Sequence, residues 1–151
     1  MTSDFDILPP LVVAAHSPRW TSLILKNANR DAVTTQWFPG IDAAIKLAAQ
    51  HSGCAMIVEL PKVESGNQQQ LERMLAQLGS LVNNPWQMMI FVVGDAAHEP
   101  FRESILRLSV QLATSVLDFD ALWARSMLHL KNHRIRDLSV EQWVEARFPF
   151  A

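Results

Sequence analysis

The chain has 151 residues, 49% hydrophobic and 19% charged, a composition typical of one globular domain and not of a disordered chain. Its formal net charge of −2 argues against a general nucleic-acid binder, because such proteins carry a basic face. Cys54 is the single cysteine, so an internal disulfide is excluded. We expect a cytoplasmic protein without a membrane partner, because no apolar run approaches the roughly 20 residues that span a bilayer and Met1–Asp6 lacks a basic start.

Five apolar, strand-like runs alternate with segments of helical periodicity. The first, third and fourth runs are almost continuously apolar, as expected of parallel strands that are covered by helices on both faces. The second run alternates apolar and polar residues, which suits an edge strand. The five predicted strands are Leu11–Ala15, Ala32–Trp37, Cys54–Leu60, Met88–Val93 and Thr114–Phe119.

The predicted helices follow from apolar residues that recur three and four positions apart. Ser17 and Pro18 form a cap and first-turn pair before the first helix, and Asp120 is the predicted cap of the fifth. In chain order, the helices are predicted at Arg19–Asn29, Ile41–Ala48, Leu71–Val82, Phe101–Leu108 and Leu122–Leu130.

This alternation of strands and helices predicts right-handed crossovers and an open α/β sheet that is doubly wound by helices. Five such units in ~120 residues favour a flavodoxin-like parallel sheet with the strand order 2-1-3-4-5. We expect an N-terminal extension over residues 1–10 and an α/β domain over residues 11–131. Residues 132–151 are expected to form a C-terminal tail with one short helix.

Several stretches resemble a known family in their order along the chain. Leu11–Pro18 (LVVAAHSP) is similar to the first strand and turn of a response-regulator receiver (CheY-like) domain. Trp37–Ala44 resembles the turn after that family's second strand and the helix that follows. Pro61 and Gly66 resemble its loop after the third strand. The resemblance extends over Leu11–Lys131 and implies the same flavodoxin-like fold.

The resemblance also implies that the receiver's phosphoryl-transfer residues are missing. Ala14 and Ala15 occupy the places of the acidic pair that binds Mg²⁺, and a methyl group cannot coordinate a hard cation. The place of the phosphoacceptor aspartate falls on Glu59 if the apolar run sets the register. It falls on Ile57 if Pro61 sets the register. In neither case is the residue an aspartate.

Two further receiver positions differ in the same way. The family has threonine or serine at the end of the fourth strand and lysine after the fifth. Here those regions read Val93–Asp95 and Leu117–Phe119. The resemblance therefore implies a degenerate pseudo-receiver that is not an enzyme and holds no metal or cofactor. Its expected role is that of a protein–protein interaction module in signalling, with a protein partner or a second copy of itself.

Polar residues follow the first, third and fourth predicted strands: His16, Glu59 and Asp95. Ligands of open α/β sheets bind beyond the carboxyl ends of the strands, so these three side chains are a candidate strand-end pocket. A histidine with two carboxylates can bind a metal or act as general acid and base, and a small α/β enzyme or ligand-binding domain is the alternative function. The alternative is that these residues have no catalytic or binding role. The ends of strands are exposed to solvent, and exposed residues are usually polar.

The predicted tail carries three aromatic residues in a largely polar segment. Burying one such ring contributes about 2 kcal/mol, so we expect the rings to pack on this domain, on a second copy or on another protein. Receivers commonly pair through the face of their fourth and fifth helices. Docking within one chain is the competing account. The candidate interface comprises Phe101, Ile105, Trp123, Trp143, Phe148 and Phe150.

Overall fold

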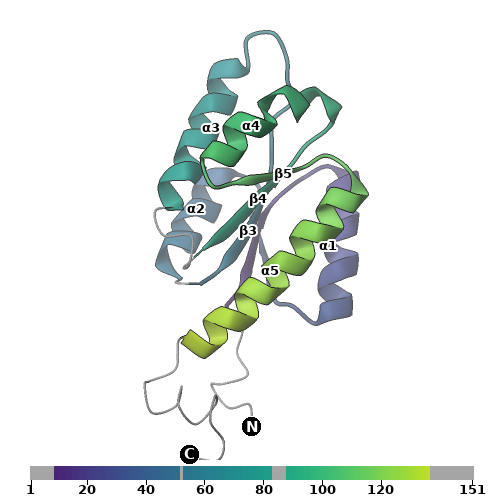
Figure 1. Cartoon of the computed structure of the whole chain (residues 1–151), viewed down its shortest axis with the longest axis vertical. Coiled ribbons are helices and arrows are strands. Elements are labelled where there is room, and N and C mark those ends of the chain that lie inside the picture. The colour runs from purple at the N-terminus through teal and green to yellow at the C-terminus, as the bar shows by residue number, and fades with distance from the viewer. Residues whose placement is uncertain (1–8, 52, 83–87, 137–151) are drawn as a thin grey trace, which may run out of the picture.

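A computed structural model describes residues 9–51, 53–82 and 88–136, with side chains described up to residue 132. Strands and helices alternate along the chain (Figure 1). The strands are β1 (Leu11–Ala14), β2 (Thr35–Trp37), β3 (Ala55–Glu59), β4 (Met89–Val93) and β5 (Gln111–Ala113). The helices are α1 (Pro18–Asp31), α2 (Ile41–Gln50), α3 (Gln68–Leu81), the 3₁₀ helix η2 (Ala96–Phe101), α4 (Arg102–Arg107) and α5 (Val116–Arg136).

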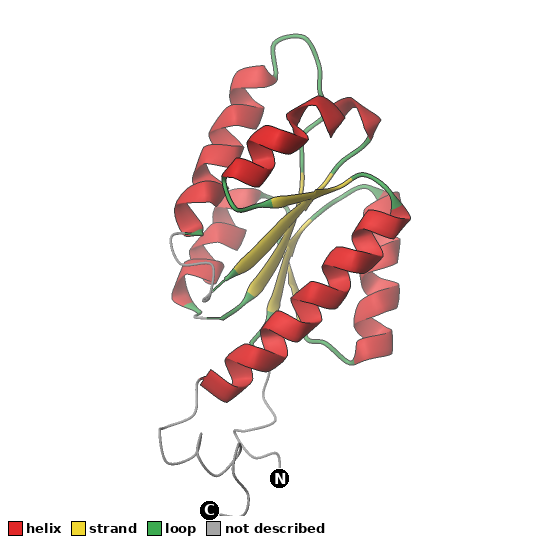
Figure 2. Cartoon of the chain, viewed as in Figure 1, coloured by secondary structure: helices red, strands yellow, loops and turns green. Residues whose placement is uncertain are grey.

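The described strands form one five-stranded, all-parallel sheet with the order β2-β1-β3-β4-β5, which confirms the predicted flavodoxin-like fold. Helices α1 and α5 cover one face of this sheet and α2, α3 and α4 cover the other (Figure 2). Ala14 pairs with Val58 and Glu59 pairs with Val93. The carboxyl ends of the three central strands therefore meet at one edge of the sheet.

The two faces of the sheet bury different kinds of side chain, because successive residues of a strand point to opposite faces. Under α1 and α5 the core is aromatic. Phe119 stacks against Trp20 and Trp123 with ring centroids 5.9 Å away in both cases, and meets the edge of Phe91 at 5.7 Å. Under α2, α3 and α4 the core is mainly aliphatic.

The prediction for the fifth strand is wrong. Thr114–Phe119 is not a strand: β5 ends at Ala113, and most of the apolar run belongs to the first turn of α5. The run is misleading because Phe119 is fully buried from a helix and not from a strand.

The predicted cap of the fifth helix is also wrong. Asp120 lies inside α5, which begins at Val116. Ser115 occupies the capping position, where its hydroxyl accepts a hydrogen bond from the backbone N–H of Asp118 at 3.2 Å.

Helix α5 continues to Arg136, beyond the expected domain end at Lys131. The rest of the expected tail, residues 137–151, and residues 1–8 of the expected extension lie outside the described residues. Among the helices of the described ranges, none has the length and apolar character needed to cross a membrane.

Candidate functional site

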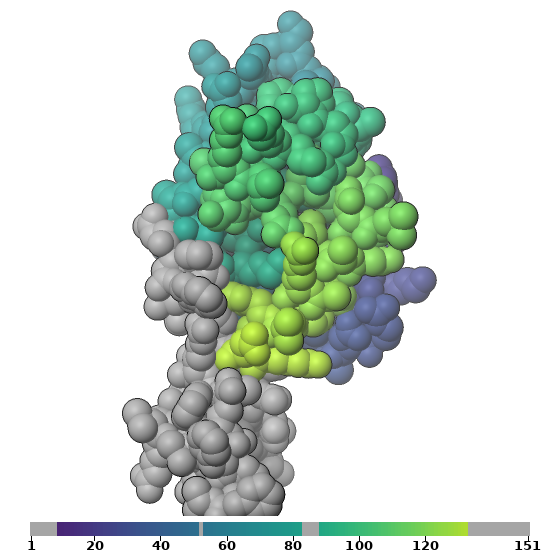
Figure 3. All heavy atoms as spheres, in the orientation of Figure 1, coloured from purple at the N-terminus to yellow at the C-terminus, as the bar shows by residue number. Residues whose placement is uncertain are grey.

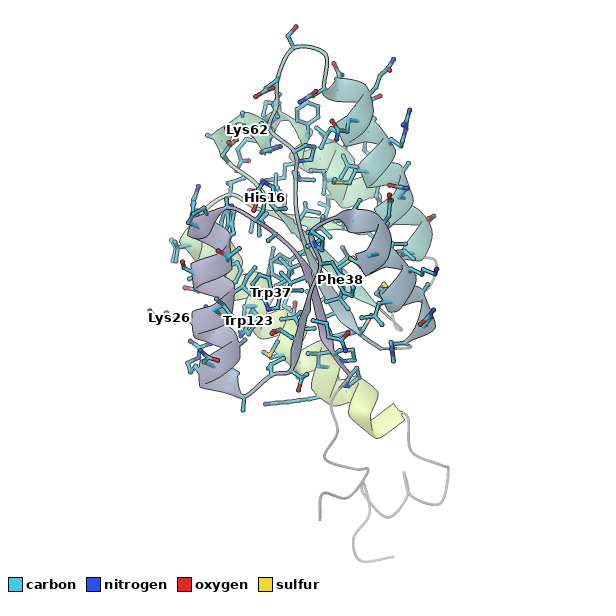
Figure 4. The ribbon with its side chains drawn as sticks, turned by 180° about the vertical axis from the view of Figure 1, so that it is seen from behind. His16, Lys26, Trp37, Phe38, Lys62 and Trp123 are labelled. Atoms are coloured by element: carbon cyan, nitrogen blue, oxygen red, sulfur yellow. The ribbon has the colours of Figure 1, made fainter. Side chains whose placement is uncertain are left out.

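The carboxylate of Glu59, at the end of β3, reaches the loop between β1 and α1. Its Oε1 accepts hydrogen bonds from the backbone N–H of His16 at 3.1 Å and of Ser17 at 2.9 Å. Its Oε2 lies 3.2 Å from Nε2 of His16. The Glu59 side chain is only 10% exposed, whereas that of His16 is 75% exposed. A nearly buried carboxylate thus lies beneath an exposed imidazole, and Figure 4 shows His16 near the start of α1.

This carboxylate holds the turn that precedes α1. Ser17 is the residue before the helix and Pro18 its first residue, as predicted, but the Ser17 side chain makes no capping hydrogen bond. Glu59 accepts from the backbone N–H groups of His16 and Ser17, which precede the helix, and not from the N–H groups of its first turn. A negative charge at a helix N-terminus is also favoured by the helix dipole, by about 0.3–1 kcal/mol. The turn before α1 therefore depends on a residue 42 positions away from Ser17.

His16 and Glu59 line a pocket of about 180 Å³, to which α3 contributes Gln70 and Met74 and the start of α2 contributes Pro39–Ile41. Pockets that enclose a drug-sized ligand usually measure about 300–1,000 Å³. The cavity is therefore too small for such a ligand.

Asp95 is not in the lining of this pocket. The chain turns into η2 directly after β4, and Asp95 caps that helix, with Oδ1 accepting from the backbone N–H of Ala97 at 2.9 Å. Of the three residues predicted to form a strand-end pocket, His16 and Glu59 therefore lie in contact. Asp95 does not line their pocket, because its side chain caps η2. Within the described ranges there is no group of three or more His, Cys, Asp or Glu side chains that could hold a metal ion.

A buried histidine connects the loops that follow β3 and β4. Nδ1 of His98 accepts from the backbone N–H of Asp95 at 3.0 Å, and Nε2 lies 2.7 Å from the carbonyl oxygen of Pro61. These contacts assign the ring as neutral, with its proton on Nε2 donated to Pro61. Asp95 Oδ1 also lies 3.2 Å from Nδ1, but it accepts from Ala97 and does not require a charged ring.

The close approach of the His98 ring explains why residue 94 is a glycine. A Cβ atom at Gly94 would lie 2.5 Å from Nδ1 of His98, well inside normal contact distance. Only glycine at the end of β4 leaves room for the ring between the two loops.

A second polar cluster, not found from the sequence, closes the carboxyl end of β5. Arg102 donates from Nε and Nη2 to the two oxygens of Glu99 at 2.8 and 2.7 Å. It also donates to Asp118 at 3.0 Å and to the carbonyl oxygen of Leu112 at 2.9 Å. Thr114 donates its hydroxyl to Glu99 and its N–H to Asp118. The cluster joins η2, α4, β5 and α5.

This cluster keeps its carboxylates ionised. Hydrogen bonds from Arg102 and then Thr114 lower the pKa of Glu99 to about 2. Burial acts to raise the pKa of Asp118, but hydrogen bonds from the Thr114 N–H and from Arg102 outweigh it, so that pKa is lowered. The hydrogen bond to Glu99 raises the pKa of Arg102. All three groups are charged at neutral pH.

The structure also settles which residues stand at the strand ends named by the receiver resemblance. Ile57 is fully buried within β3, and Glu59 is its last residue. Because β5 ends at Ala113, the residue that follows it is Thr114 and not the Leu117–Phe119 segment. The residue after β5 is thus not a lysine either.

The candidate interface residues that lie in the described ranges do not form a free surface. Ile105 is fully buried and Trp123 is 2% exposed, and Phe101 packs partly buried against the core. Their apolar periodicity reflects helix packing on the sheet. Trp143, Phe148 and Phe150 lie outside the described residues. Up to residue 132, where the described side chains end, the exposed large apolar residues of α4 and α5 are Leu106, Val116, Leu117 and Leu128.

The fold places the chain among flavodoxin-like α/β domains. No family model and no curated protein matches its sequence. The pilus assembly protein CpaE from Caulobacter crescentus CB15 is similar in structure, with a TM-score of 0.54 at 17% identity over 80% of this chain and 95% of that chain. Lysine decarboxylase A from Pseudomonas aeruginosa has a TM-score of 0.54 at 18% identity over 85% of this chain, which spans only 19% of the decarboxylase. At these identities the likeness concerns the fold alone.

Proposed function

We propose that the chain is a pseudo-receiver that carries no phosphoryl group and acts as a protein–protein interaction module in signalling. The observation that supports this proposal is the environment of Glu59. A receiver presents carboxylates to a metal from the end of its first strand, whereas this loop presents two backbone N–H groups and an imidazole. Such donors suit a carboxylate and offer no hard oxygen ligand to Mg²⁺.

The same contacts suggest why phosphorylation would be unnecessary. Glu59 places a permanent negative charge at the end of β3, where a receiver forms its acyl phosphate. One charge is smaller than the −1.5 to −2 or so of a phosphoryl group, but it is always present. In this proposal the charge holds the loop after β1 in one conformation, so a partner meets a surface that does not switch.

Acetyl phosphate or beryllofluoride with Mg²⁺ is expected to leave the protein unchanged. An acyl phosphate requires an aspartate nucleophile and a metal that neutralises the developing charge, and Ala14 and Ala15 provide no ligand for that metal. Intact-mass spectrometry and tryptophan fluorescence measure the two responses, with an active receiver treated in parallel as the positive control. Phosphate on any residue at the carboxyl edge of the sheet would overturn the proposal.

Glu59→Gln is expected to lower the free energy of unfolding by about 1–3 kcal/mol, because hydrogen bonds to a charged acceptor are replaced by weaker ones. The backbone amides of His16 and Ser17 should exchange faster with deuterium. Chemical unfolding and hydrogen exchange measure these changes. Glu64→Gln, which alters an exposed carboxylate in the next loop, is the matched control. Equal stability of both variants would remove the locked-loop part of the proposal.

The interaction part of the proposal is tested by affinity capture from the native host followed by mass spectrometry, with sedimentation analysis to detect self-association. The wild-type chain should retain a reproducible partner or form a dimer. Retention should weaken for Glu59→Gln and not for Glu64→Gln. A chain that is monomeric and captures no partner would contradict the proposed role.

A further inference from the structure

The two edges of the sheet differ in what binds their outward backbone groups. In an edge strand, every second residue directs its N–H and C=O groups away from the sheet. The edge strands are β5 and β2. In Figure 1 β5 lies at the front of the sheet, and Figure 3 shows atoms of α4 and α5 on that side of the molecule.

Arginine side chains block the outward carbonyl groups of β5. The carbonyl oxygen of Ala113 accepts a hydrogen bond from the residue after β4 and so faces the sheet. The carbonyl oxygens of Leu112 and Thr114, on either side of it, therefore point outward. The first accepts from Arg102 at 2.9 Å, and the second accepts from Arg19 at 2.8 Å. A strand that paired with β5 would have to displace both arginines.

The β2 edge has no such cover within the described part of the chain. The carbonyl oxygen of Thr34 and the N–H of Phe38 bond to β1. The backbone groups of Thr35 and Trp37 therefore point away from the sheet, and no described residue binds them. Figure 4 shows Trp37 between α1 and α2. Residues 32–41 carry no charged side chain, although charged side chains commonly protect free strand edges from pairing.

We propose that β2 pairs with β2 of a second copy of the chain, antiparallel about a twofold axis at Gln36. Thr35 then lies opposite Trp37 of the second copy, and the two residues exchange both backbone hydrogen bonds. All outward N–H and C=O groups of β2 are satisfied in this arrangement. The pairing rests on the interaction role proposed above and gives that role a surface and a partner.

Neighbouring residues select this register. A shift of two residues in one direction places Thr35 opposite Pro39, which has no N–H to donate. A shift in the other direction places Trp37 opposite Val33, whose N–H already bonds to the last turn of α1. Either shift therefore leaves an outward carbonyl oxygen of β2 without a donor.

A second copy suits this edge better than a separate extended peptide. A peptide would cover β2 but present its own free outer edge. Two copies related by a twofold axis cover both β2 edges at once, and the blocked β5 edges stop further growth, so the assembly closes as a dimer. The pairing also places the Trp37 ring opposite the β-branched Thr35 of the other copy, a combination that stabilises sheets.

Gln36→Cys tests the register directly. Its two Cα atoms would face each other across the axis at about 4.5 Å, within the range of roughly 4.4–6.8 Å for a disulfide. Mild oxidation should therefore link two chains, as measured by intact-mass spectrometry. Gln77→Cys, at an exposed position of α3, is the control, and the native Cys54 is buried. Linkage of Gln36→Cys no faster than of the control would overturn the proposal.

Thr35→Pro tests the backbone bonds, because it removes an outward N–H and leaves the bonds from β2 to β1 intact. Sedimentation equilibrium should show dimerisation weakened about 5- to 150-fold, since two hydrogen bonds across the axis are lost. Thr35→Ala removes the same hydroxyl but keeps the N–H, so it is the matched control. Circular dichroism confirms folding. Equal dimerisation of the two folded variants would place the interface elsewhere and overturn the proposal.

Charges at the axis provide a test that does not depend on proline. Gln36→Lys and Gln36→Glu should each weaken self-association about two- to fivefold, and an equal mixture of the two should restore it. Gln77→Lys is the control for a change of surface charge. No recovery in the mixture would contradict the pairing.

The wild-type chain separates this proposal from the interaction role itself. A monomer that still captures a partner would remove only the β2 pairing, whereas a monomer that captures none would remove both. Hydrogen exchange at the amides of Thr35 and Trp37 should slow as protein concentration rises. Slow exchange in a monomer would show that another part of the same chain covers β2, which would also overturn the pairing.

Discussion

Phe119→Ala is expected to lower the free energy of unfolding by about 3–5 kcal/mol, the usual cost of removing a buried phenyl ring. The Phe119 side chain is fully buried, and its ring contacts Trp20, Phe91 and Trp123, which come from α1, β4 and α5. Alanine leaves a cavity among three large rings that are held by their own elements and collapse poorly. Urea unfolding monitored by circular dichroism measures the loss.

The control lies two residues earlier in the same helix. Leu117 is 83% exposed, so Leu117→Ala should change stability by no more than about 0.5 kcal/mol. Both substitutions shorten an apolar side chain in the first turn of α5. A similar loss in both variants would mean that helix propensity, and not the aromatic cluster, determines the effect.

Gly94→Ala is expected to cost about 1–3 kcal/mol, because the added methyl group overlaps a ring that has no room to move. The new Cβ would lie 2.5 Å from Nδ1 of His98. Both ring nitrogens of His98 are held by backbone groups, at Asp95 and Pro61. Gly40→Ala is the control, since a Cβ there meets nothing within 4 Å.

A double-mutant cycle separates this overlap from a general intolerance of alanine at the end of β4. His98→Ala alone should cost about 1–3 kcal/mol, because it leaves backbone groups at Asp95 and Pro61 without their partner. With the ring gone, Gly94→Ala should cost less than about 0.5 kcal/mol more. The two changes are therefore expected to be strongly non-additive. Additive losses in chemical unfolding would show that the ring does not restrict position 94.

The central strands were predictable because both of their faces are buried. Continuous apolar runs mark β1, β3 and β4 to within one residue at each end. The second strand begins later than predicted because Ala32, with a φ of 53°, still belongs to the C-terminal cap of α1. The last strand has only three residues, one of them Gln111, so its signal is weaker than that of the apolar helix start beyond it.

The strand-end site was predictable from the sequence only where the order of the strands in the sheet is enough to bring two residues together. His16 and Glu59 follow adjacent parallel strands, and they meet. Asp95 follows a neighbouring strand too, but its capping of η2 takes precedence. The role of His98 depends on the absence of a side chain at Gly94, and the Arg102 cluster depends on the true end of β5. Neither of these features produces a periodic pattern in the sequence, so neither could be predicted from it.

The hydrogen bonds around Glu59 limit which side chains the end of β1 can carry. Ala14 is 8% exposed and lines the same small pocket as Glu59. An aspartate there would bring a second negative charge beside a carboxylate whose two oxygens are already occupied, and a metal could bind only if those bonds were broken first. Each single step toward cation binding thus passes through a less stable protein. Acidic residues at this edge are therefore hard to introduce one mutation at a time.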